Sequence, residues 1–331
     1  MLLQVKNLKT QFKTKAGLIN AVNGVNFEVN DGEVTAIVGE SGSGKSVTAL
    51  SLMRLIADPP GKIADGEILF ENEDLLKKSR RQIQDIRGSK ISMVFQEPMT
   101  SLNPIFTIER QICETLIRHK NMTKKDAAYE AVKMLKLVGI PSPEKRMKNY
   151  PHQMSGGMRQ RVMIAMALIC KPKLLIADEP TTALDVTIQA QILDLMIKLK
   201  NKLGTSILLI THDLGVVAET ADKVIVMYCG KIVEKGSVQE IFEKPLHPYT
   251  EGLIKSIPKI TDTKEKLYMI EGSVPDPVNL PKGCAFEGRC SKCMNICKIK
   301  QPEITKMGGR EVRCFIYEKE ASHHEREVIT G

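Results

Sequence analysis

The run GESGSGKS, Gly39–Ser46, combines the features that phosphate binding requires. It matches the spacing G-x-x-x-x-G-K-[ST], and it lies between an apolar, strand-like stretch at 34–38 and a helix-forming stretch at 47–55. This strand–loop–helix setting distinguishes a phosphate-binding loop from an ordinary Gly/Ser-rich turn. Successive backbone N–H groups of such a loop, with the positive end of the following helix, bind phosphate oxygens. The chain is therefore predicted to bind a nucleoside triphosphate.

Individual residues of this loop have predicted roles. Gly42 and Gly44 allow the backbone to turn tightly. Lys45 is expected to reach the β- and γ-phosphates, and Ser46 is expected to give its hydroxyl to Mg²⁺. The predicted ligands in the loop are Gly39, Ser41, Gly42, Ser43, Gly44, Lys45 and Ser46.

Two carboxylates follow an apolar stretch in KLLIADEP, Lys173–Pro180. Asp178 is placed to hold Mg²⁺ through its water shell, and Glu179 to orient or deprotonate the attacking water. Burying both without a cation would be costly, which argues against a purely structural role. The sequence thus predicts hydrolysis as well as binding.

A second anion-binding motif is predicted in MSGGMRQR, Met154–Arg161. Ser155, Gly156 and Gly157 open a predicted helix there, and a helix N-terminus attracts anions. Two such sites in one chain require either two ligands or one ligand shared between two chains.

The elements that position these motifs alternate between strands and helices. Up to about residue 35 the pattern is strand-like, broken by a turn signal at Asp31-Gly32. Further strands are predicted at 67–70, 91–95, 174–178, 206–211 and 224–228, and helical patterns at 107–139, 156–170, 186–203 and 214–220. This alternation is typical of an α/β fold with a mainly parallel sheet, into which a helical block at about 96–171 is inserted.

Composition argues against two classes of function. A net charge of +9 and a pI near 9.0 permit contact with nucleic acid, but basic residues are interleaved with acidic ones, Trp is absent and aromatics make up 4%. We therefore predict no nucleic-acid partner. The start of the chain lacks the features of a signal peptide, and no apolar run approaches the ~20 residues that cross a bilayer. A cytoplasmic location is expected.

Five of the eight cysteines lie within Cys284–Cys314. Their spacing is Cys284-x5-Cys290-x2-Cys293-x3-Cys297, with Cys314 sixteen residues further on. In a reducing compartment such a cluster indicates metal rather than disulfides. The spacing alone suits an iron–sulfur cluster or zinc. The single cysteines, Cys113, Cys170 and Cys229, are predicted to be small buried hydrophobes.

Taken together, the loop at Gly39–Ser46, the strand ending in Asp178-Glu179 and the MSGGMRQR run resemble the nucleotide-binding subunits of ABC transporters. The resemblance implies an ABC-type P-loop NTPase domain. In that family the signature of one subunit, here Ser155–Gly157, closes over ATP bound to another subunit.

The resemblance also implies roles for residues outside these motifs. Gln96 in VFQEP matches the Q-loop that senses Mg²⁺, and Asp185 in TTALDV matches the D-loop. His212 in LLITHD matches the switch histidine that contacts the γ-phosphate. Phe12 is the expected adenine-stacking aromatic, with core packing as the alternative.

The match to one subfamily extends over essentially the whole chain. YPHQMSGGMRQRVMIAMAL, the HPYT at His247–Thr250 and the cysteine-bearing tail are similar to the D-type ATPase of oligopeptide/dipeptide (and nickel) importers. This implies a head-to-tail heterodimer with an F-type ATPase subunit, two membrane permease subunits and an external substrate-binding protein. The chain would then lie on the inner face of the cell membrane.

The same resemblance assigns the cysteines. Related importer ATPases carry four at the positions of Cys284, Cys290, Cys297 and Cys314 and are associated with a [4Fe–4S] cluster, with zinc as the alternative here. Cys293 stands where they have a small residue, so it is expected not to be a ligand.

These observations predict an ABC nucleotide-binding domain at 1–240, with the helical subdomain at about 96–171, and a small Cys-rich domain at 241–331. The predicted function is an ATPase that powers import of peptides, or of a related solute such as nickel, through a membrane ABC transporter. The alternative is a soluble ABC ATPase acting on nucleic acid or the ribosome. Such proteins separate the two motifs by a long coiled coil or carry two heads per chain, and neither pattern is present.

Overall fold

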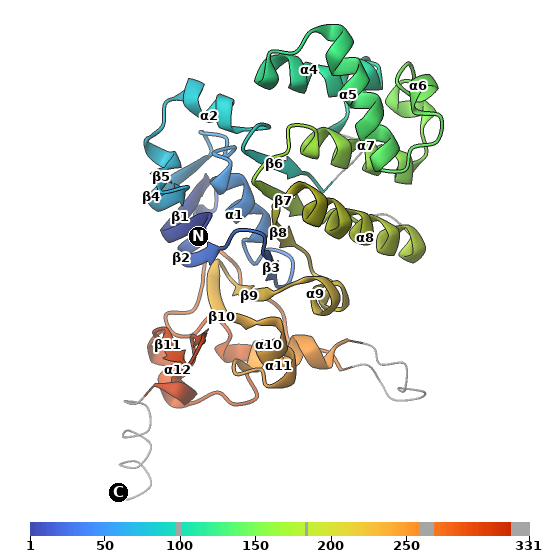
Figure 1. The fold of residues 1–331 in the computed structure, drawn as a ribbon. Helices are drawn as coiled ribbons and strands as arrows, with labels where there is room; N and C mark the ends of the chain where they lie inside the picture. Colours follow the sequence, from blue (N-terminus) through green and yellow to red (C-terminus); the bar gives the residue numbers. More distant parts are fainter. Residues whose placement is uncertain (97–100, 183–184, 258–267, 319–331) are drawn as a thin grey trace, which may run out of the picture. The chain divides into compact units, whose positions relative to one another are not determined.

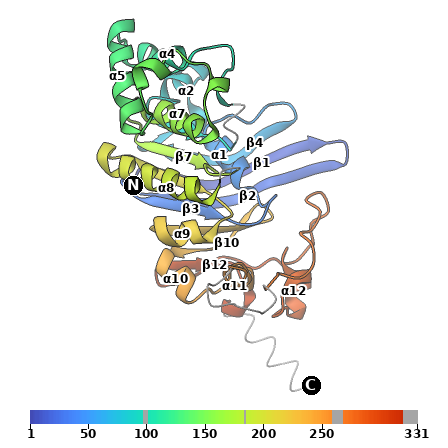
Figure 2. The ribbon, with the colours of Figure 1, turned by 90° about the vertical axis from the view of Figure 1, so that its right-hand side faces the viewer.

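The computed structural model describes residues 1–96, 101–182, 185–257 and 268–318. Within these ranges the chain packs into two units, each assembled from segments that are distant in sequence. The first unit takes residues 1–3, 28–34 and 69–210, and the second takes residues 4–27, 35–68 and 211 onwards. Figures 1 and 2 show the elements along the chain, coloured from blue at the N-terminus to red at the C-terminus.

Three parallel strands form the centre of the first unit: β6 (Ile91–Val94), β7 (Leu174–Asp178) and β8 (Ser206–Ile210). β7 lies between the other two, because Leu174 pairs with Ile91 on one side and with Ser206 on the other. Every residue of β7 and β8 is buried, as expected for parallel strands covered on both faces. The predicted bounds of β7 are confirmed, and β8 ends one residue earlier than predicted.

The long helices of the first unit begin at capping side chains. α4 (Ile108–Lys120) and α5 (Lys124–Leu137) each follow a Thr whose hydroxyl accepts a backbone N–H, which satisfies a donor left unpaired at the helix start. Left-handed Asn121 ends α4, so the helical pattern predicted over 107–139 is divided into two helices. α4, α5 and α7 (Gly156–Leu168) pack on one another and lie together with α6 (Pro143–Arg146) in Figure 1.

The remaining elements of this unit are shorter or flank the sheet. They are β5 (Glu73–Asp74), which pairs with the end of β4 (Gly61–Phe70), η1 (Leu75–Lys77), α2 (Arg80–Ile86), η2 (Pro151–Gln153) and α8 (Val186–Leu203). α8 has the predicted bounds and packs against α7.

The sheet of the second unit is parallel at one pair and antiparallel at the others. β3 (Val34–Val38) runs parallel to β9 (Lys223–Tyr228), and β9 pairs antiparallel with β10 (Lys231–Ser237). β10 in turn pairs with β12 (Arg310–Val312), which pairs with β11 (Thr305–Met307). The sequence does not predict the antiparallel strands of the C-terminal region, because β11 and β12 are too short for an alternating pattern.

The second unit also contains the long N-terminal strands. β1 (Leu3–Thr14) lies between β2 (Gly17–Val29) and β4, and a buried hydrogen bond of 2.8 Å joins Thr10 on β1 to Ser51 on α1 (Lys45–Leu52). Its other helices are α9 (Leu214–Thr220), α10 (Val238–Glu243), α11 (Pro248–Lys255), η3 (Glu287–Arg289), α12 (Asn295–Ile299) and η4 (Phe315–Tyr317).

Helix length and polarity bear on membrane insertion. Among the residues that the structure describes, no helix combines the length and the apolar character that crossing a membrane requires.

Candidate nucleotide-binding site

The loop between β3 and α1 has a backbone that requires glycine. Gly39, Gly42 and Gly44 have φ angles of 149°, 77° and 100°, in the region that L side chains rarely adopt. A Cβ on Gly39 would lie 2.2 Å from the carbonyl oxygen of Met227, and one on Gly44 would lie 2.3 Å from that of Ala21. Gly39 and Gly44 are therefore fixed both by conformation and by close backbone approach.

Lys45 lies inside this loop. Its side chain is only 6% exposed, and Nζ donates to the carbonyl oxygens of Gly39 at 2.7 Å and Glu40 at 2.9 Å. Ser46, the next residue, is half-buried on the first turn of α1. An ammonium group held by loop carbonyls is placed where a phosphate bound to the loop would meet it.

Glu40 connects the loop to the C-terminal region, a contact that the sequence does not indicate. Its N–H donates to the hydroxyl of Tyr249 at 2.8 Å, and its carboxylate accepts from both terminal nitrogens of Arg289, at 2.6 and 3.0 Å. Arg289 lies on η3, between Cys284 and Cys290. No short motif could predict a pair separated by 249 positions.

In the first unit, the structure brings Gln96 and Glu179 together. Gln96 follows β6 and Glu179 follows the neighbouring β7, and Nε2 of Gln96 donates to the Glu179 carboxylate at 3.0 Å. Thr182 donates to the same carboxylate oxygen at 2.9 Å. Asp178, the last residue of β7, is 5% exposed.

The backbone at Glu179 is unusual. Its φ is 45°, a left-handed conformation that costs a non-glycine residue about 1–3 kcal/mol and that clusters at functional sites. Its N–H donates to the carbonyl oxygen of Ile210 at 2.8 Å, which holds this turn at the end of the sheet.

The MSGGMRQR run forms the start of α7 as predicted. Ser155 caps the helix by accepting the N–H of Met158 at 3.4 Å, and both Ser155 and Gly156 are exposed. A Cβ on Gly157 would lie 3.2 Å from Ile188 of α8. Deeper in the helix, buried Gln160 donates to the carbonyl oxygen of Pro180. That contact, which sequence analysis missed, ties the helix to the turn after Glu179.

Asp185 and His212 both lie close to helix starts. Asp185 is exposed and caps α8 by accepting the N–H of Ile188 at 2.9 Å. His212 is exposed in the second unit, one residue beyond Thr211, whose N–H donates to Ile37 of β3 at 3.2 Å. His212 therefore lies at the same strand end from which the phosphate loop departs.

Phe12 packs against backbone. Its side chain is half-buried, and a Cβ on Gly61 would lie 2.6 Å from its ring. The ring thus rests on the glycine that begins β4. This contact accords with the packing alternative, and adenine stacking stays a prediction.

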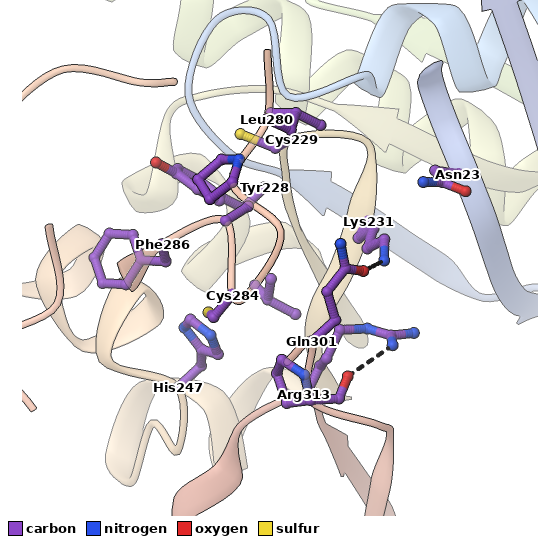
Figure 3. Close-up of a pocket in the computed structure, with 14 residues that line it drawn as sticks. Asn23, Tyr228, Cys229, Lys231, His247, Leu280, Cys284, Phe286, Gln301 and Arg313 are labelled. Atoms are coloured by element: carbon purple, nitrogen blue, oxygen red, sulfur yellow. Dashed lines mark hydrogen bonds between the residues drawn. The ribbon is translucent and has the colours of Figure 1, made fainter. Parts of the chain in front are cut away.

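Four cysteines share one small cavity. Cys284, Cys290, Cys297 and Cys314 all line it, whereas Cys293 does not. Burial, followed by the nearby thiols, raises the pKa of Cys284 to about 12, and burial raises the pKa of Cys314 to about 11. Cys284 also lines a neighbouring pocket, drawn in Figure 3, together with Tyr228 and Phe286.

The arrangement of these thiols does not match a single-ion site. In the described ranges, no three His, Cys, Asp or Glu side chains stand so that they could hold a metal ion. Zinc requires thiolates gathered around one ion at about 2.3 Å, so this alternative has no support there. Of the single cysteines, Cys113 and Cys170 are buried as predicted, and Cys229 is half-buried.

Comparison with known proteins identifies the family. Residues 22–182 match the ABC transporter model, and residues 233–297 match the model of the oligopeptide/dipeptide transporter C-terminal region. A relative from Bacillus subtilis (strain 168), the oligopeptide transport ATP-binding protein AppD, is 59% identical over 97% of this chain and 98% of its own length. The chain belongs to the ABC transporter family, as an ATP-binding subunit of the oligopeptide/dipeptide type.

Other relatives agree with this assignment. The dipeptide transport ATP-binding protein DppD of Bacillus subtilis (strain 168) is 52% identical over 97% of this chain and 96% of its own. Among solved structures, the dimeric post-hydrolysis ATP-binding cassette MJ0796 bound to ADP and Pi has a TM-score of 0.64 at 29% identity, covering 72% of this chain and 99% of that one. CbiO1 from Clostridium perfringens has a TM-score of 0.62 at 31% identity, covering 73% and 91%.

The family assignment decides between the predicted functions. The subunit is an ATPase whose hydrolysis of ATP is coupled to transport. Nothing in these matches favours the alternative of an ATPase acting on nucleic acid or the ribosome.

Proposed function

We propose that this subunit powers the import of peptides through a membrane ABC transporter, with Glu179 as the group that activates water. The observation that carries the proposal is the hydrogen bond from Gln96 to Glu179, which brings together two predicted site residues that follow neighbouring strands. The similarity to AppD, an oligopeptide transport protein, and to DppD, a dipeptide transport protein, supports oligopeptides or dipeptides as cargo over nickel.

The phosphate loop binds the triphosphate in this proposal. Loop N–H groups would surround the phosphates, apart from that of Glu40, which donates to Tyr249, and Lys45 would move from the loop carbonyls to the β- and γ-phosphate oxygens. Ser46 and Gln96 would hold Mg²⁺, with Asp178 acting through a water molecule. A bound Mg²⁺ would neutralise charge that develops on the phosphates.

Glu179 then orients the attacking water and accepts its proton. Its fixed backbone and the donors Gln96 and Thr182 hold the carboxylate in one position before the nucleotide arrives. His212 contacts the γ-phosphate, and Phe12 stacks on adenine.

A partner chain would complete the site. Ser155, Gly156 and Asp185 are exposed at helix starts, which supports their facing ATP on a second subunit rather than on this one. We propose an F-type ATPase subunit as that partner in a head-to-tail heterodimer. Two permease subunits and an external substrate-binding protein complete the transporter, with this chain cytoplasmic on the inner face of the membrane.

The domain organisation is proposed as in the sequence prediction, with the boundary near residue 240 and helices α4–α7 as a helical subdomain at about 96–171. The match of residues 233–297 to the transporter C-terminal region supports a distinct C-terminal segment.

That C-terminal segment is proposed to hold a [4Fe–4S] cluster on Cys284, Cys290, Cys297 and Cys314. Their convergence on one cavity that excludes Cys293 supports this set, because four irons each take one thiolate and need the sulfurs further apart than a single ion does. Anaerobically purified protein should then contain about four irons and absorb near ~400 nm. Cys293→Ala should keep the iron, and Cys297→Ala should lose it. Colourless protein with one tightly held zinc would contradict the cluster.

The proposed function is tested in vesicles that contain the complete transporter. Wild type should take up labelled peptide in the presence of ATP, and Lys45→Ala should abolish both ATP binding and uptake because the loop loses its buried cation. Lys198→Gln is the matched control: it also removes a lysine charge, but from an exposed pair with Asp194 on α8, so it should keep uptake. Uptake of nickel but not of peptide would refute the assignment of peptides as the cargo.

A further inference from the structure

We propose that Arg289 positions the phosphate loop through Glu40, so that the cysteine-bearing segment forms part of the nucleotide site. The inference rests on the proposed role of the loop in binding ATP. Arg289 is 7% exposed, and its guanidinium binds the Glu40 carboxylate through two parallel contacts of 2.6 and 3.0 Å. Such bidentate pairs are directional, so they fix orientation as well as distance.

Glu40 is held at three points. Tyr249 accepts its N–H at 2.8 Å, Lys45 donates to its carbonyl oxygen at 2.9 Å, and Arg289 binds its carboxylate. The hydrogen bond from Lys45 to the Glu40 carbonyl oxygen connects the ion pair to the cation that is proposed to bind phosphate. A shift of Glu40 would therefore move the carbonyl on which Lys45 rests.

Contacts other than those with Glu40 also hold Arg289 in place. Its Nε donates to the carbonyl oxygen of Glu271 at 3.1 Å, and its guanidinium carbon lies 5.9 Å from the ring centres of Tyr228 and Phe286. Those rings form a cluster with Tyr249, with centres 4.7 to 5.4 Å apart. Figure 3 shows Tyr228 and Phe286 beside Cys284. The guanidinium therefore has little freedom to leave Glu40.

Charge gives the pair a second effect. A carboxylate in a loop that binds a triphosphate repels the ligand, and because the Glu40 side chain is 27% exposed, solvent and salt screen this repulsion only in part. Arg289 neutralises Glu40, so its loss should weaken ATP binding more than the loss of both charges together.

The position of Arg289 extends the nucleotide site to the C-terminal region. It lies directly before Cys290, and Phe286 follows Cys284 by two residues. The predicted domain boundary near residue 240 separates the phosphate loop from the cysteine segment, but the ion pair joins them. A change in the packing around the four-cysteine cavity should therefore alter the position of the phosphate loop.

The test is a double-mutant cycle in the full-length chain. Binding of a fluorescent ATP analogue with Mg²⁺ is titrated in wild type, Arg289→Gln, Glu40→Gln and the double variant. Arg289→Gln loses both the positioning contact and the neutralisation of Glu40, so it should lower the affinity about tenfold, whereas Glu40→Gln and the double variant lose only the positioning contact and should each lower it about threefold. Lys255→Gln is the matched control: it removes an exposed ion pair to Glu251 of 2.7 Å on α11, it does not line the four-cysteine cavity, and it should bind normally.

Each result decides the inference. The inference would be overturned if Arg289→Gln bound the ATP analogue with an affinity within twofold of wild type. It would also be overturned if Arg289→Gln caused the same loss of affinity in the Glu40→Gln background as in wild type, because Arg289 would then act other than through Glu40. If Arg289→Gln does not fold, Tyr249→Phe removes only the hydroxyl that holds Glu40 and should weaken binding about threefold; unchanged binding would refute the positioning role. Lys45→Ala separates this inference from the proposed function, because full ATP binding by that variant would refute the role of the loop in binding ATP.

Discussion

Replacing Glu179 by Gln should stop hydrolysis while leaving ATP binding intact. The side chain keeps its shape, and its remaining carbonyl oxygen can still accept from Gln96 and Thr182, so the site geometry is retained. What is lost is the ability to accept a proton from water. A positioned base contributes about 10²–10⁴-fold to rate, which corresponds to about 3–5 kcal/mol of barrier.

The assay requires the assembled transporter, because one subunit is proposed to supply the signature for the other's ATP. The rate of phosphate release should fall by about 10²–10⁴-fold. ATP should stay bound between the two ATPase subunits, because the closed subunits no longer hydrolyse it. Thr182→Val provides the graded comparison: it leaves the carboxylate but removes one donor, so we expect about a tenfold loss or less. Near-wild-type turnover by Glu179→Gln would remove this residue from the role of base.

Three further predictions use other contacts. Gly44→Ala should abolish ATP binding and lower the free energy of unfolding by at least about 2 kcal/mol, measured by denaturant titration, because its Cβ would lie 2.3 Å from the Ala21 oxygen at a φ of 100°. Gln160→Met should lower kcat more than it raises KM, because the Pro180 turn loses its donor; equal effects on both would contradict this. Hydrogen bonds from two lysines lower the pKa of Glu71, so this carboxylate stabilises the fold above its unfolded pKa of about 4.5. Glu71→Gln should cost up to about 1 kcal/mol at pH 7, and its difference from wild type should vanish in acid.

The phosphate loop and its flanking elements could be predicted because their information is local. The glycines, Lys45 and the apolar strand at Val34–Val38 lie within one short segment, and the strand has the predicted bounds. The same holds for β7 and the turn at Glu179. Helix α1 begins at Lys45, two residues before the predicted start, because the last loop residues already adopt helical geometry.

Contacts between distant segments could not be predicted in this way. Gln160 and Pro180 are twenty positions apart, and each looks ordinary in its own segment. The pairing of β10 with β12 could not be predicted because β12 has three residues, too few to show an alternating pattern. Charged residues such as Arg289 are common in the chain, and only the fold reveals which one is buried against a carboxylate.

The end of β9 explains why the phosphate loop and the cysteine segment meet. The carbonyl oxygen of Met227 approaches Gly39 so closely that no side chain fits there, and the next residue, Tyr228, packs its ring edge-on against Phe286 at 5.3 Å. One strand end therefore supports the loop through its backbone and the C-terminal segment through its side chain. Because Phe286 packs against Tyr228 and lies 5.9 Å from the Arg289 guanidinium, a displacement of Phe286 would act on both residues. The Arg289–Glu40 pair is the contact through which a change in the cysteine cavity would alter the affinity of the loop for ATP.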